Sequence, residues 1–474
     1  MFAVRLHSVP TRADLRGLLQ LAAPIVVIQV GIMAMGVVDT LMVGRVSAEA
    51  LAAVALANLY TFIFQVFGFG VLMALDPIVA QALGAGDRLG VARGLQRGFL
   101  LSLVLTVPTA ALMATVEPAL QLAGQPPEVI PDAAGYVYRV MPAVWPLYGF
   151  VVCRLVLQAH RRTAPVVVTI ILANLLNAAL NYVWIFGHLG FPAMGVLGSA
   201  WATMASRWFM LAAVLALAWP HLSPYLRKPA PNLLAVQPLA RMLALGAPIG
   251  AQMVLEIGAF GMVAILMGRL GVVQVAAHQV AINLASLTFM VPLGVSSAAA
   301  VIVGHAVGRG DPGAVRRSTS AAILVGAAFM SVTAALFLSL PGPLARLYTD
   351  EAAVAALAAS LLPIAGVFQV FDGLQVVALG LLRGLGDTRA PMLLNVLGYW
   401  IVGLPLSVWL GFGLGLGAAG LWWGLVVALA AVAATLLLRL AHRQRRELAR
   451  IVIDEHVELP APGAAAAAVR RKAG

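Results

Sequence analysis

The sequence is poor in charge and almost free of cysteine. Only 10% of its 474 residues are charged, against about 25% in a soluble domain. Too few polar side chains are present to cover a soluble chain of this length, so a soluble enzyme of several domains is excluded. The single cysteine, Cys153, excludes an intrachain disulfide. The 46 glycines and 27 prolines follow no period, which excludes a collagen-like chain.

The apolar residues make up 62% of the chain and gather in long runs. A membrane-spanning helix needs about 20 apolar residues. Twelve runs meet this length: 17–43, 51–82, 94–116, 136–159, 164–187, 195–219, 241–267, 274–307, 316–340, 353–382, 390–412 and 417–439. The sequence therefore predicts an all-α polytopic membrane protein with twelve transmembrane helices.

The charges that remain are mostly basic and unevenly placed, with 30 Lys and Arg against 18 Asp and Glu. The N-terminus, every second connector and the C-terminal tail carry 25 of the 30. The opposite connectors carry Arg45, Arg139, Arg269 and Arg346, and Arg207 lies inside the sixth run. The positive-inside rule then places both termini in the cytoplasm. We interpret the basic charge as contact with anionic lipid headgroups, not nucleic acid.

The N-terminal run is too long for a cleavable signal, since it spans 27 residues. Arg outnumbers Lys by 28 to 2, which indicates the codon usage of a GC-rich bacterial genome. We therefore predict a multi-pass protein of the bacterial inner (cytoplasmic) membrane.

The two halves of the sequence resemble each other. Residues 21–87, shifted by 224, align without a gap on 245–311 with 19 identities in 67 positions. Six is an even number of spans, so both halves insert in the same orientation. This predicts two six-helix bundles related by a pseudo-two-fold axis along the membrane normal, with substrate bound between them.

The predicted division of the chain follows from these runs. It comprises a cytosolic N-terminus at 1–16, bundles at 17–219 and 241–439, a linker at 220–240 and a basic cytosolic tail at 440–474. The linker contains five prolines, Pro220 and Pro224 among them, and is expected to be extended. The tail is expected to form a short helix that frays into disorder at its end.

Four acidic residues lie inside predicted spans: Asp39, Asp76, Glu256 and Asp372. A carboxylate in hydrocarbon costs about 2.5 kcal/mol or more, and such residues usually face a cavity and carry function. The alternative is a structural partnership with Arg207, with His278 or with kinked backbone. Asp76 precedes Pro77, so capping of a bend is an equal alternative for that residue.

Amide side chains accompany these acids at helical spacing. The sets are Gln252 with Glu256; Gln369 and Gln375 around Asp372; Gln279, Asn283 and Ser286; and Asn174, Asn177 and Asn181. Any single amide is equally well explained as a contact that holds two helices together. A carboxylate in a low-dielectric cavity can take up a proton, hold Na⁺ or attract an organic cation. The recurrence of polar faces beside acids in both halves therefore favours a cation-coupled exporter.

Six stretches in order resemble the MATE (multidrug and toxic compound extrusion) family, in its NorM-type branch. They are MGVVDTLMVGRVS at 35–47, LMALDPIVAQALGAG at 72–86, LNAALNYVWIFG at 176–187, VLEIGAFGMVAILMGRLG at 254–271, VAAHQVAINLASLTFMVPLGVSSA at 275–298 and FQVFDGLQVVALGLLRGLGDT at 368–388. The resemblance covers about residues 15–440 and implies a V-shaped pair of bundles. It also implies export of cationic, amphipathic drugs by alternating access in exchange for Na⁺ or H⁺.

The resemblance also implies roles for single residues. Asp39 matches the aspartate of the family's first helix, and Asn177, Asn181 and Thr203 resemble its polar neighbours. Glu256 and Asp372 match an acidic pair assigned to cation binding, and so to Na⁺ if that is the ion. Phe368 stands where the family often has a tyrosine. The missing hydroxyl counts against strict Na⁺ coupling, and we favour protons for at least part of it.

The sequence thus predicts a monomeric antiporter with no cofactor besides its coupling ion, whose partners are cationic small molecules and the lipid bilayer. One alternative is a lipid-linked oligosaccharide flippase of the same superfamily. It would need a strongly cationic cavity, whereas the central spans carry only Arg207 against three acids. A second alternative, an integral membrane enzyme, would need clustered histidines or a nucleophile beside a base, and the eight histidines are scattered.

Overall fold

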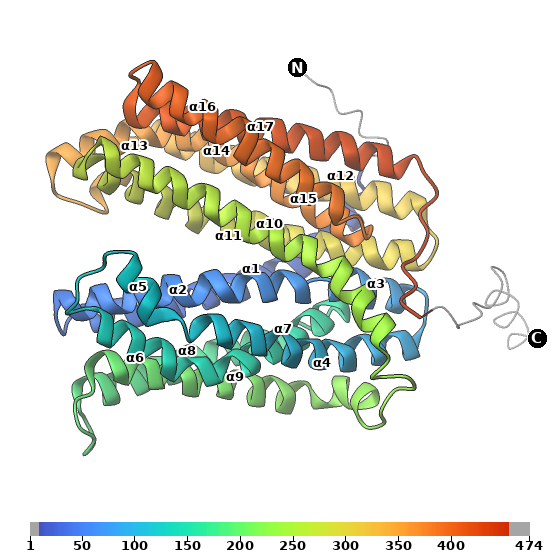
Figure 1. Ribbon diagram of the computed structural model, residues 1–474. Helices are drawn as coiled ribbons and strands as arrows, with labels where there is room; N and C mark the ends of the chain where they lie inside the picture. The colour runs from blue at the N-terminus through green and yellow to red at the C-terminus, as the bar shows by residue number, and fades with distance from the viewer. Residues whose placement is uncertain (1–8, 455–474) are drawn as a thin grey trace, which may run out of the picture.

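The computed structural model describes residues 9–454, and all regular structure in that range is helical (Figure 1). Twelve helical segments are long and apolar enough to cross a membrane, which confirms the predicted fold class. They are α1 (Arg12–Val43), α2 (Ala48–Leu72) with α3 (Leu75–Gly84), α4 (Arg88–Met113), α6 (Ile130–Val140) with α7 (Val144–Ala159), α8 (Ala164–Phe186), α9 (Gly195–Leu226), α10 (Val236–Leu270), α11 (Val272–Gly308), α12 (Pro312–Ser339), α14 (Ala352–Gly384), α15 (Arg389–Val396) with α16 (Leu404–Val408), and α17 (Gly417–Gln444). Two short helices, α5 (Val116–Leu122) and α13 (Pro341–Arg346), lie in connectors.

Two helix ends differ from the predicted apolar runs. Helix α1 begins at Arg12, before the run 17–43, because Thr11 and Asp14 form a capping box there. The linker is shorter than 220–240, because α9 continues through Pro220 and Pro224 to Leu226. Prolines four residues apart lie on one face, so the helix loses hydrogen bonds along that face alone and continues.

Three spans contain irregular segments that the apolar runs did not reveal. The fourth span passes through a 3₁₀ turn at Met141–Ala143, between α6 and α7. The second span is interrupted between α2 and α3, and Pro77 lies in the first turn of α3. A proline is tolerated there, because the first N–H groups of a helix have no partner within it. The eleventh span contains two π-helical segments, Leu397–Gly403 and Trp409–Gly413.

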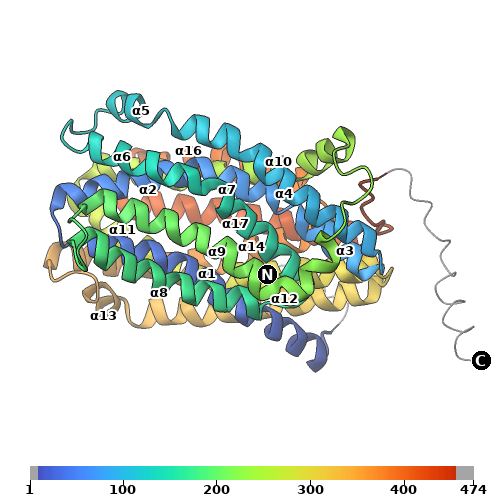
Figure 2. The ribbon, with the colours of Figure 1, turned by 90° about the horizontal axis from the view of Figure 1, so that it is seen from below.

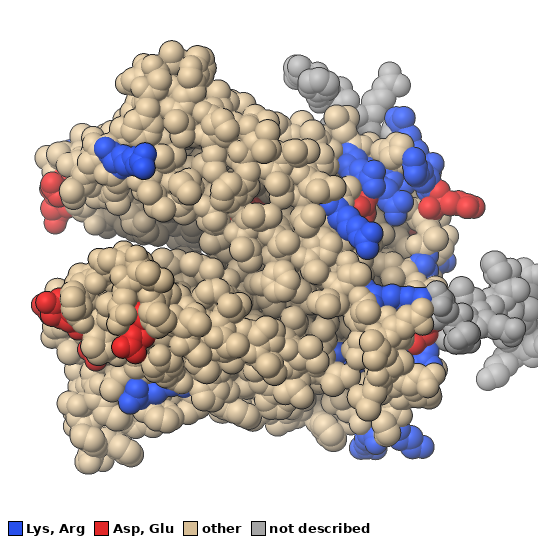
Figure 3. Space-filling view, in the orientation of Figure 1, with Lys and Arg blue, Asp and Glu red and all other residues tan. Residues whose placement is uncertain are grey.

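The helices form two lobes, α1–α9 and α10–α17, and their axes are roughly parallel (Figures 1 and 2). Buried apolar clusters fill each lobe, and Leu18, Leu21 and Ile25 of α1 are buried with the second lobe. Most of the visible Lys and Arg side chains gather at one end, which we call the basic end, and a few lie at the other (Figure 3). At the opposite end a groove separates the lobes, and we call it the open end.

Glycines let the lobes touch at the level of the backbone near the basic end. A Cβ added to Gly84 would overlap the His305 carbonyl, and one added to Gly308 would overlap the Gln81 carbonyl. These contacts are reciprocal, because each second-lobe residue stands 224 positions after its counterpart in the first. A two-fold axis between the repeats produces this pattern.

The same reciprocity recurs further from the basic end. Gly70 meets the backbone of Gly250, and its counterpart Gly294 meets that of Val26. At both levels each contact in one repeat has a reciprocal contact in the other, and the axis passes between the two. Because the two levels are separated along the helices, the axis runs along them. The repeat geometry predicted from the sequence, with no inversion of one half, is therefore confirmed.

The Gly-Asp turn of each repeat also folds alike. Gly86 and Gly310 adopt φ of 72° and 68°, which favours glycine. The next residue caps the following helix: Asp87 Oδ1 accepts from the Gly90 N–H at 2.7 Å, and Asp311 Oδ1 accepts from the Ala314 N–H at 2.8 Å. The repeated motif thus turns the chain at equivalent places in the two lobes.

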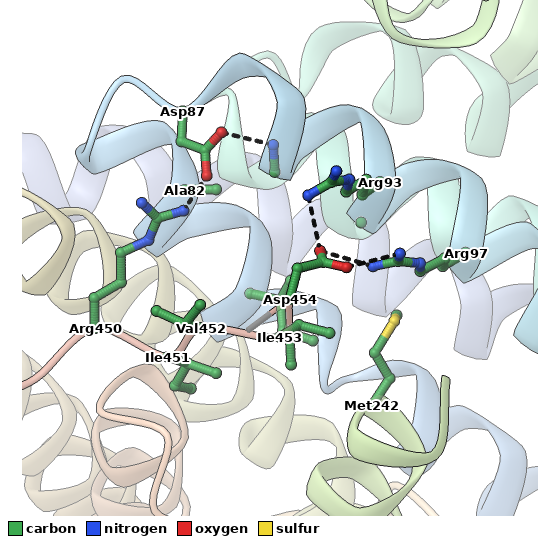
Figure 4. A pocket seen from close by; sticks show the side chains of 13 residues that line it. Ala82, Asp87, Arg93, Arg97, Met242, Arg450, Ile451, Val452, Ile453 and Asp454 are labelled. Carbon is green, nitrogen blue, oxygen red and sulfur yellow. Dashed lines mark hydrogen bonds and ion pairs between the residues drawn. The ribbon is translucent and has the colours of Figure 1, made fainter. Parts of the chain in front are cut away.

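Residues 445–454 follow α17 and lie against the first lobe; we call them the C-terminal strap (Figure 4). The Ile451 N–H donates to Gln81 Oε1 at 2.8 Å, and Arg450 pairs with Asp87. Asp454 accepts two hydrogen bonds of 2.9 Å from Arg97. Distant residues of the first lobe thus hold this part of the tail, a contact that the sequence did not predict. The predicted disorder at the end of the tail concerns residues 455–474, outside the described residues.

Acid is expected to release the strap. Burial opposes ionisation of Asp454, but hydrogen bonds and charge from Arg97, with charge from Arg93, outweigh burial and lower the pKa of this carboxyl. A lowered pKa means that the contact is stable at neutral pH and is lost as the pH falls through the lowered pKa of Asp454. A spin label on Val452→Cys should be immobile at pH 7 and mobile in acid, and buried Cys153 should not compete for the label.

The control for this titration is Asp454→Asn, which should mobilise the label already at pH 7 and show no further acid transition. A spectrum of the wild-type strap that is independent of pH would contradict the assignment.

Candidate cation- and substrate-binding sites

A cavity of about 560 Å³ lies mainly within the second lobe, lined by residues of α10, α11 and α14. Phe62 of α2 and Met73 contribute from the first lobe. Drug-sized ligands occupy pockets of about 300–1,000 Å³, lined mainly by apolar groups with a few placed polar ones. This cavity has the size and the wall expected for such a ligand.

Glu256 of α10 and Asp372 of α14 both line this cavity. These are the two acids that the resemblance assigns to cation binding, and the structure places both at one cavity. Gln252, one turn before Glu256, and Gln279 of α11 also line it. The two carboxylates therefore face a space that a cationic ligand can enter.

A buried polar network holds Glu256 from behind. Gln375 Nε2 donates to Glu256 Oε1 at 3.3 Å, and the Tyr399 hydroxyl donates to the same oxygen at 3.4 Å. The same hydroxyl lies 2.8 Å from Gln375 Oε1, so its single proton is shared between the two oxygens, while Asn395 Oδ1 accepts from Gln375 Nε2 at 2.8 Å. The network fixes the carboxylate of Glu256 at the cavity wall.

Asn395 and Tyr399 were not among the predicted site residues. Asn395 is the lone amide of the apolar run 390–412, and Tyr399 follows four residues later. Side chains at i and i+4 share a helix face, so this pair was the available signal. The π-helical segment that begins at Leu397 weakens that signal, because it alters the helical period between the two residues.

The other predicted amides do not all reach the cavity. Gln369 is fully buried and accepts from the Thr288 hydroxyl at 2.5 Å, so it packs against α11. Asn283 accepts from Gln279 Nε2 at 3.3 Å. The expectation that Gln369, Asp372 and Gln375 share one face is too simple. Residues at i, i+3 and i+6 spread over about 120° of a helix, which is wide enough to meet different neighbours.

Phe368 belongs to an aromatic wall of the cavity. Its ring centroid lies 5.4 Å from that of Trp422 and 5.9 Å from that of Phe260. The Phe260 ring in turn lies 5.8 Å from that of Tyr399. Position 368 has no hydroxyl, but Tyr399 of the eleventh span places a hydroxyl beside Glu256.

Asp39 forms a second, separate cluster in the first lobe. It is 3% exposed, and its two oxygens accept from Asn181 Nδ2 at 2.5 Å and from the Thr203 hydroxyl at 2.9 Å. Asn181 Nδ2 also donates to Asn177 Oδ1 at 3.1 Å. All four residues come together as the resemblance implies. Tyr136, whose hydroxyl lies 3.4 Å from that of Thr203, joins them and was not predicted.

This cluster still contains unused hydrogen-bonding groups. Among the described residues, Asn177 Nδ2 and Asn181 Oδ1 have no partner although both are buried. Buried polar groups are normally satisfied, and an unmatched donor and acceptor beside a carboxylate indicate a place for a water molecule or an ion. The arrangement can hold a proton on Asp39 or a hydrated cation next to it.

Asp76 does more than cap a bend. Its carboxylate pairs with Arg383 of α14 across the two lobes, with 3.0 Å between Arg383 Nε and Asp76 Oδ2. The expectation that the central spans carry only Arg207 is therefore wrong. Helix α14 extends to Gly384 and contains Arg383, and Arg154 lies within α7.

Comparison with known proteins identifies the family. The MatE family model matches residues 24–183 and 248–409. The multidrug resistance protein NorM of Rhizobium meliloti (strain 1021), so named as probable, is 37% identical over 93% of this chain and 95% of its own. The multidrug resistance protein MdtK of Pectobacterium atrosepticum is 34% identical over 93% and 98%.

A solved structure shows the same fold. The eukaryotic MATE transporter AtDTX14 superposes with a TM-score of 0.82 at 21% identity, over 91% of this chain and 98% of its own. Together with the match to both repeats, these similarities establish that the chain belongs to the MATE family of multi-pass membrane transporters, in its NorM-type branch.

Proposed function

We propose that the protein exports cationic, amphipathic compounds across the inner membrane in exchange for H⁺ or Na⁺. The observation that carries this proposal is the charge of the cavity. Glu256 and Asp372 face it, whereas Arg383 is paired with Asp76 and Asp387 is paired with Arg439 at 2.8 Å. The wall therefore presents negative charge that favours a cation.

Alternating access supplies the cycle. The positive-inside rule assigns the basic end to the cytoplasm, so a groove at the open end faces outward (Figure 3). Closed packing of the lobes at the basic end and separation at the open end match an outward-facing state. Movement of the lobes about the level of their glycine contacts would expose the cavity to the cytoplasm instead.

The family consists of transporters, which disfavours an integral membrane enzyme. The oligosaccharide flippase stays as the second candidate, because the structure adds Arg154 and Arg383 to the buried arginines. Arg383 borders the cavity, but Asp76 neutralises it. A pyrophosphate would meet two carboxylates before it met an unpaired guanidinium, so cationic cargo is favoured.

Efflux of a cationic dye from proteoliposomes, under separately imposed Na⁺ and proton gradients, tests this function. At least one gradient should drive dye transport well above that of protein-free vesicles, and collapse of that gradient by an ionophore should stop it. An anionic dye of similar size should not be carried. Equal transport of both dyes, or transport that ignores both gradients, would contradict the proposal.

A further inference from the structure

The floor of the cavity at the basic end contains an ion pair that joins the lobes. Asp76 belongs to α3 of the first lobe and Arg383 to α14 of the second. Asp76 is 1% exposed, whereas Arg383 lines the cavity. The guanidinium also reaches Met73, with 3.8 Å between Arg383 Nη1 and the Met73 sulfur. The pair therefore lies at the junction between the substrate cavity and the closed end of the molecule.

Contacts next to the pair also cross between the lobes. Gln81 Nε2, one turn further along α3, donates to the Gly384 carbonyl at 3.0 Å. Gly84 meets the His305 backbone beyond it. Because these contacts lie at the same end as Asp76 and Arg383, opening of the cavity toward the basic end must separate the ion pair.

The two partners are unequal once separated. Arg383 borders the cavity and can be hydrated from it. Asp76 is enclosed, and the other charged side chain that acts on it is Arg154 of α7, whose Nη1 donates to Gln29 Oε1 at 3.0 Å. Removal of one partner of a buried pair leaves an uncompensated charge, and this is far more disruptive than removal of both.

We propose that Asp76 and Arg383 act as a latch that holds the cavity closed at the basic end and sets the balance between the two access states. The two residues are positioning residues, since they act on the orientation of the lobes and not on the ion. The inference rests on the proposed alternating access. It predicts an asymmetric result: Arg383→Gln strands Asp76 in the interior, whereas Asp76→Asn leaves Arg383 with access to water.

The test is a distance measurement between spin labels on the two lobes at the basic end. Leu89→Cys of α4 and Arg316→Cys of α12 are exposed positions, and the native Cys153 is buried. Pulsed electron resonance of the labelled protein in lipid nanodiscs should give one main short distance. Arg383→Gln should raise the long-distance population at least about tenfold, since an unpaired buried carboxylate favours the open, hydrated state.

Asp76→Asn should produce a smaller rise, and the double variant Asp76→Asn/Arg383→Gln should resemble Asp76→Asn. The matched control is Arg439→Gln, which removes the same charge at the same end but acts inside the second lobe, where Asp387 keeps a second partner, Arg443, at 3.5 Å. It should leave the distances unchanged. In transport, the latch variants should alter the turnover of the cationic dye.

Unchanged distances in Arg383→Gln and Asp76→Asn would overturn the latch, as would an equal shift in Arg439→Gln. If Arg383→Gln does not accumulate, Asp76→Asn and the double variant decide the matter, because both lack the latch and both should show the long distance. The distances are measured without transport. If the variants shift the distance distribution but the wild-type protein transports no dye, the latch is supported and the proposed function is rejected.

Discussion

Replacement of Glu256 by glutamine is expected to reduce dye efflux to the level of protein-free vesicles under either ion gradient. Glutamine retains an oxygen that can accept from Tyr399 and Gln375, so the network behind the residue survives. What is lost is one of the two negative charges that face the cavity. Asp372→Asn removes the other and should have the same effect. Efflux from proteoliposomes with equal protein content is the measurement.

The control for both variants is Asp350→Asn, which neutralises an exposed carboxylate in the connector before α14. It should transport at the wild-type rate. The glutamine and asparagine variants should also retain the thermal stability of the wild type in detergent. Wild-type efflux in both cavity variants would mean that the second lobe does not contain the coupling or cargo site.

The lengths of the apolar runs were enough to predict the spans, and the identities at an offset of 224 predicted the repeat. Hydrocarbon demands about 20 apolar residues per helix, and few other structures satisfy the backbone in a membrane. The boundaries failed where local chemistry decided them. Thr11 and Asp14 cap α1 before the apolar run begins, and Pro220 lies within α9.

The Asp39 cluster was predictable from the family resemblance, which implies that Asn177, Asn181 and Thr203 are its polar neighbours. Spacing alone places only the two amides on one helix face. The network behind Glu256 was only half predictable. Gln375 follows the helical period of α14, but Tyr399 reaches Glu256 from a span whose π-helical segments shift its register. Periodicity in the sequence assumes a regular helix and cannot place a side chain beyond such a segment.

Pairings between distant parts of the chain were not predictable. Arg97 and Asp454 are 357 positions apart, and no local sequence pattern around either residue indicates that they are in contact. Arg383 was assigned to a connector because its charge ended the apolar run one residue earlier. Only the packing of α3 against α14 shows that this arginine turns inward to meet Asp76. A charge excluded from a span by composition can still be buried when its partner comes from the other lobe.

Replacement of Asp39 by asparagine is expected to lower proton-driven efflux at least about tenfold while dye binding to the cavity stays unchanged. Asp39 is in the first-lobe cluster and does not line the cavity, so its loss should not alter the affinity for cargo. The amide of an asparagine side chain, unlike a carboxylate, cannot take up and release a proton near neutral pH. Its amide nitrogen would also face a donor, either Asn181 Nδ2 or the Thr203 hydroxyl. Efflux under a proton gradient, beside equilibrium dye binding, measures the two properties separately.

Efflux driven by Na⁺ is the result that would contradict proton coupling at Asp39. Na⁺ prefers several hard oxygen ligands, and around Glu256 the structure offers the hydroxyl of Tyr399 in place of the one that Phe368 lacks. If Na⁺ drives efflux with the proton gradient collapsed, and Glu256→Gln abolishes this efflux while Asp39→Asn does not, proton coupling at Asp39 is wrong. In that case Tyr399→Phe should weaken Na⁺ dependence, because it removes an oxygen 3.4 Å from the carboxylate. Phe368→Tyr should leave Na⁺ dependence unaltered if the aromatic wall keeps that ring against Trp422.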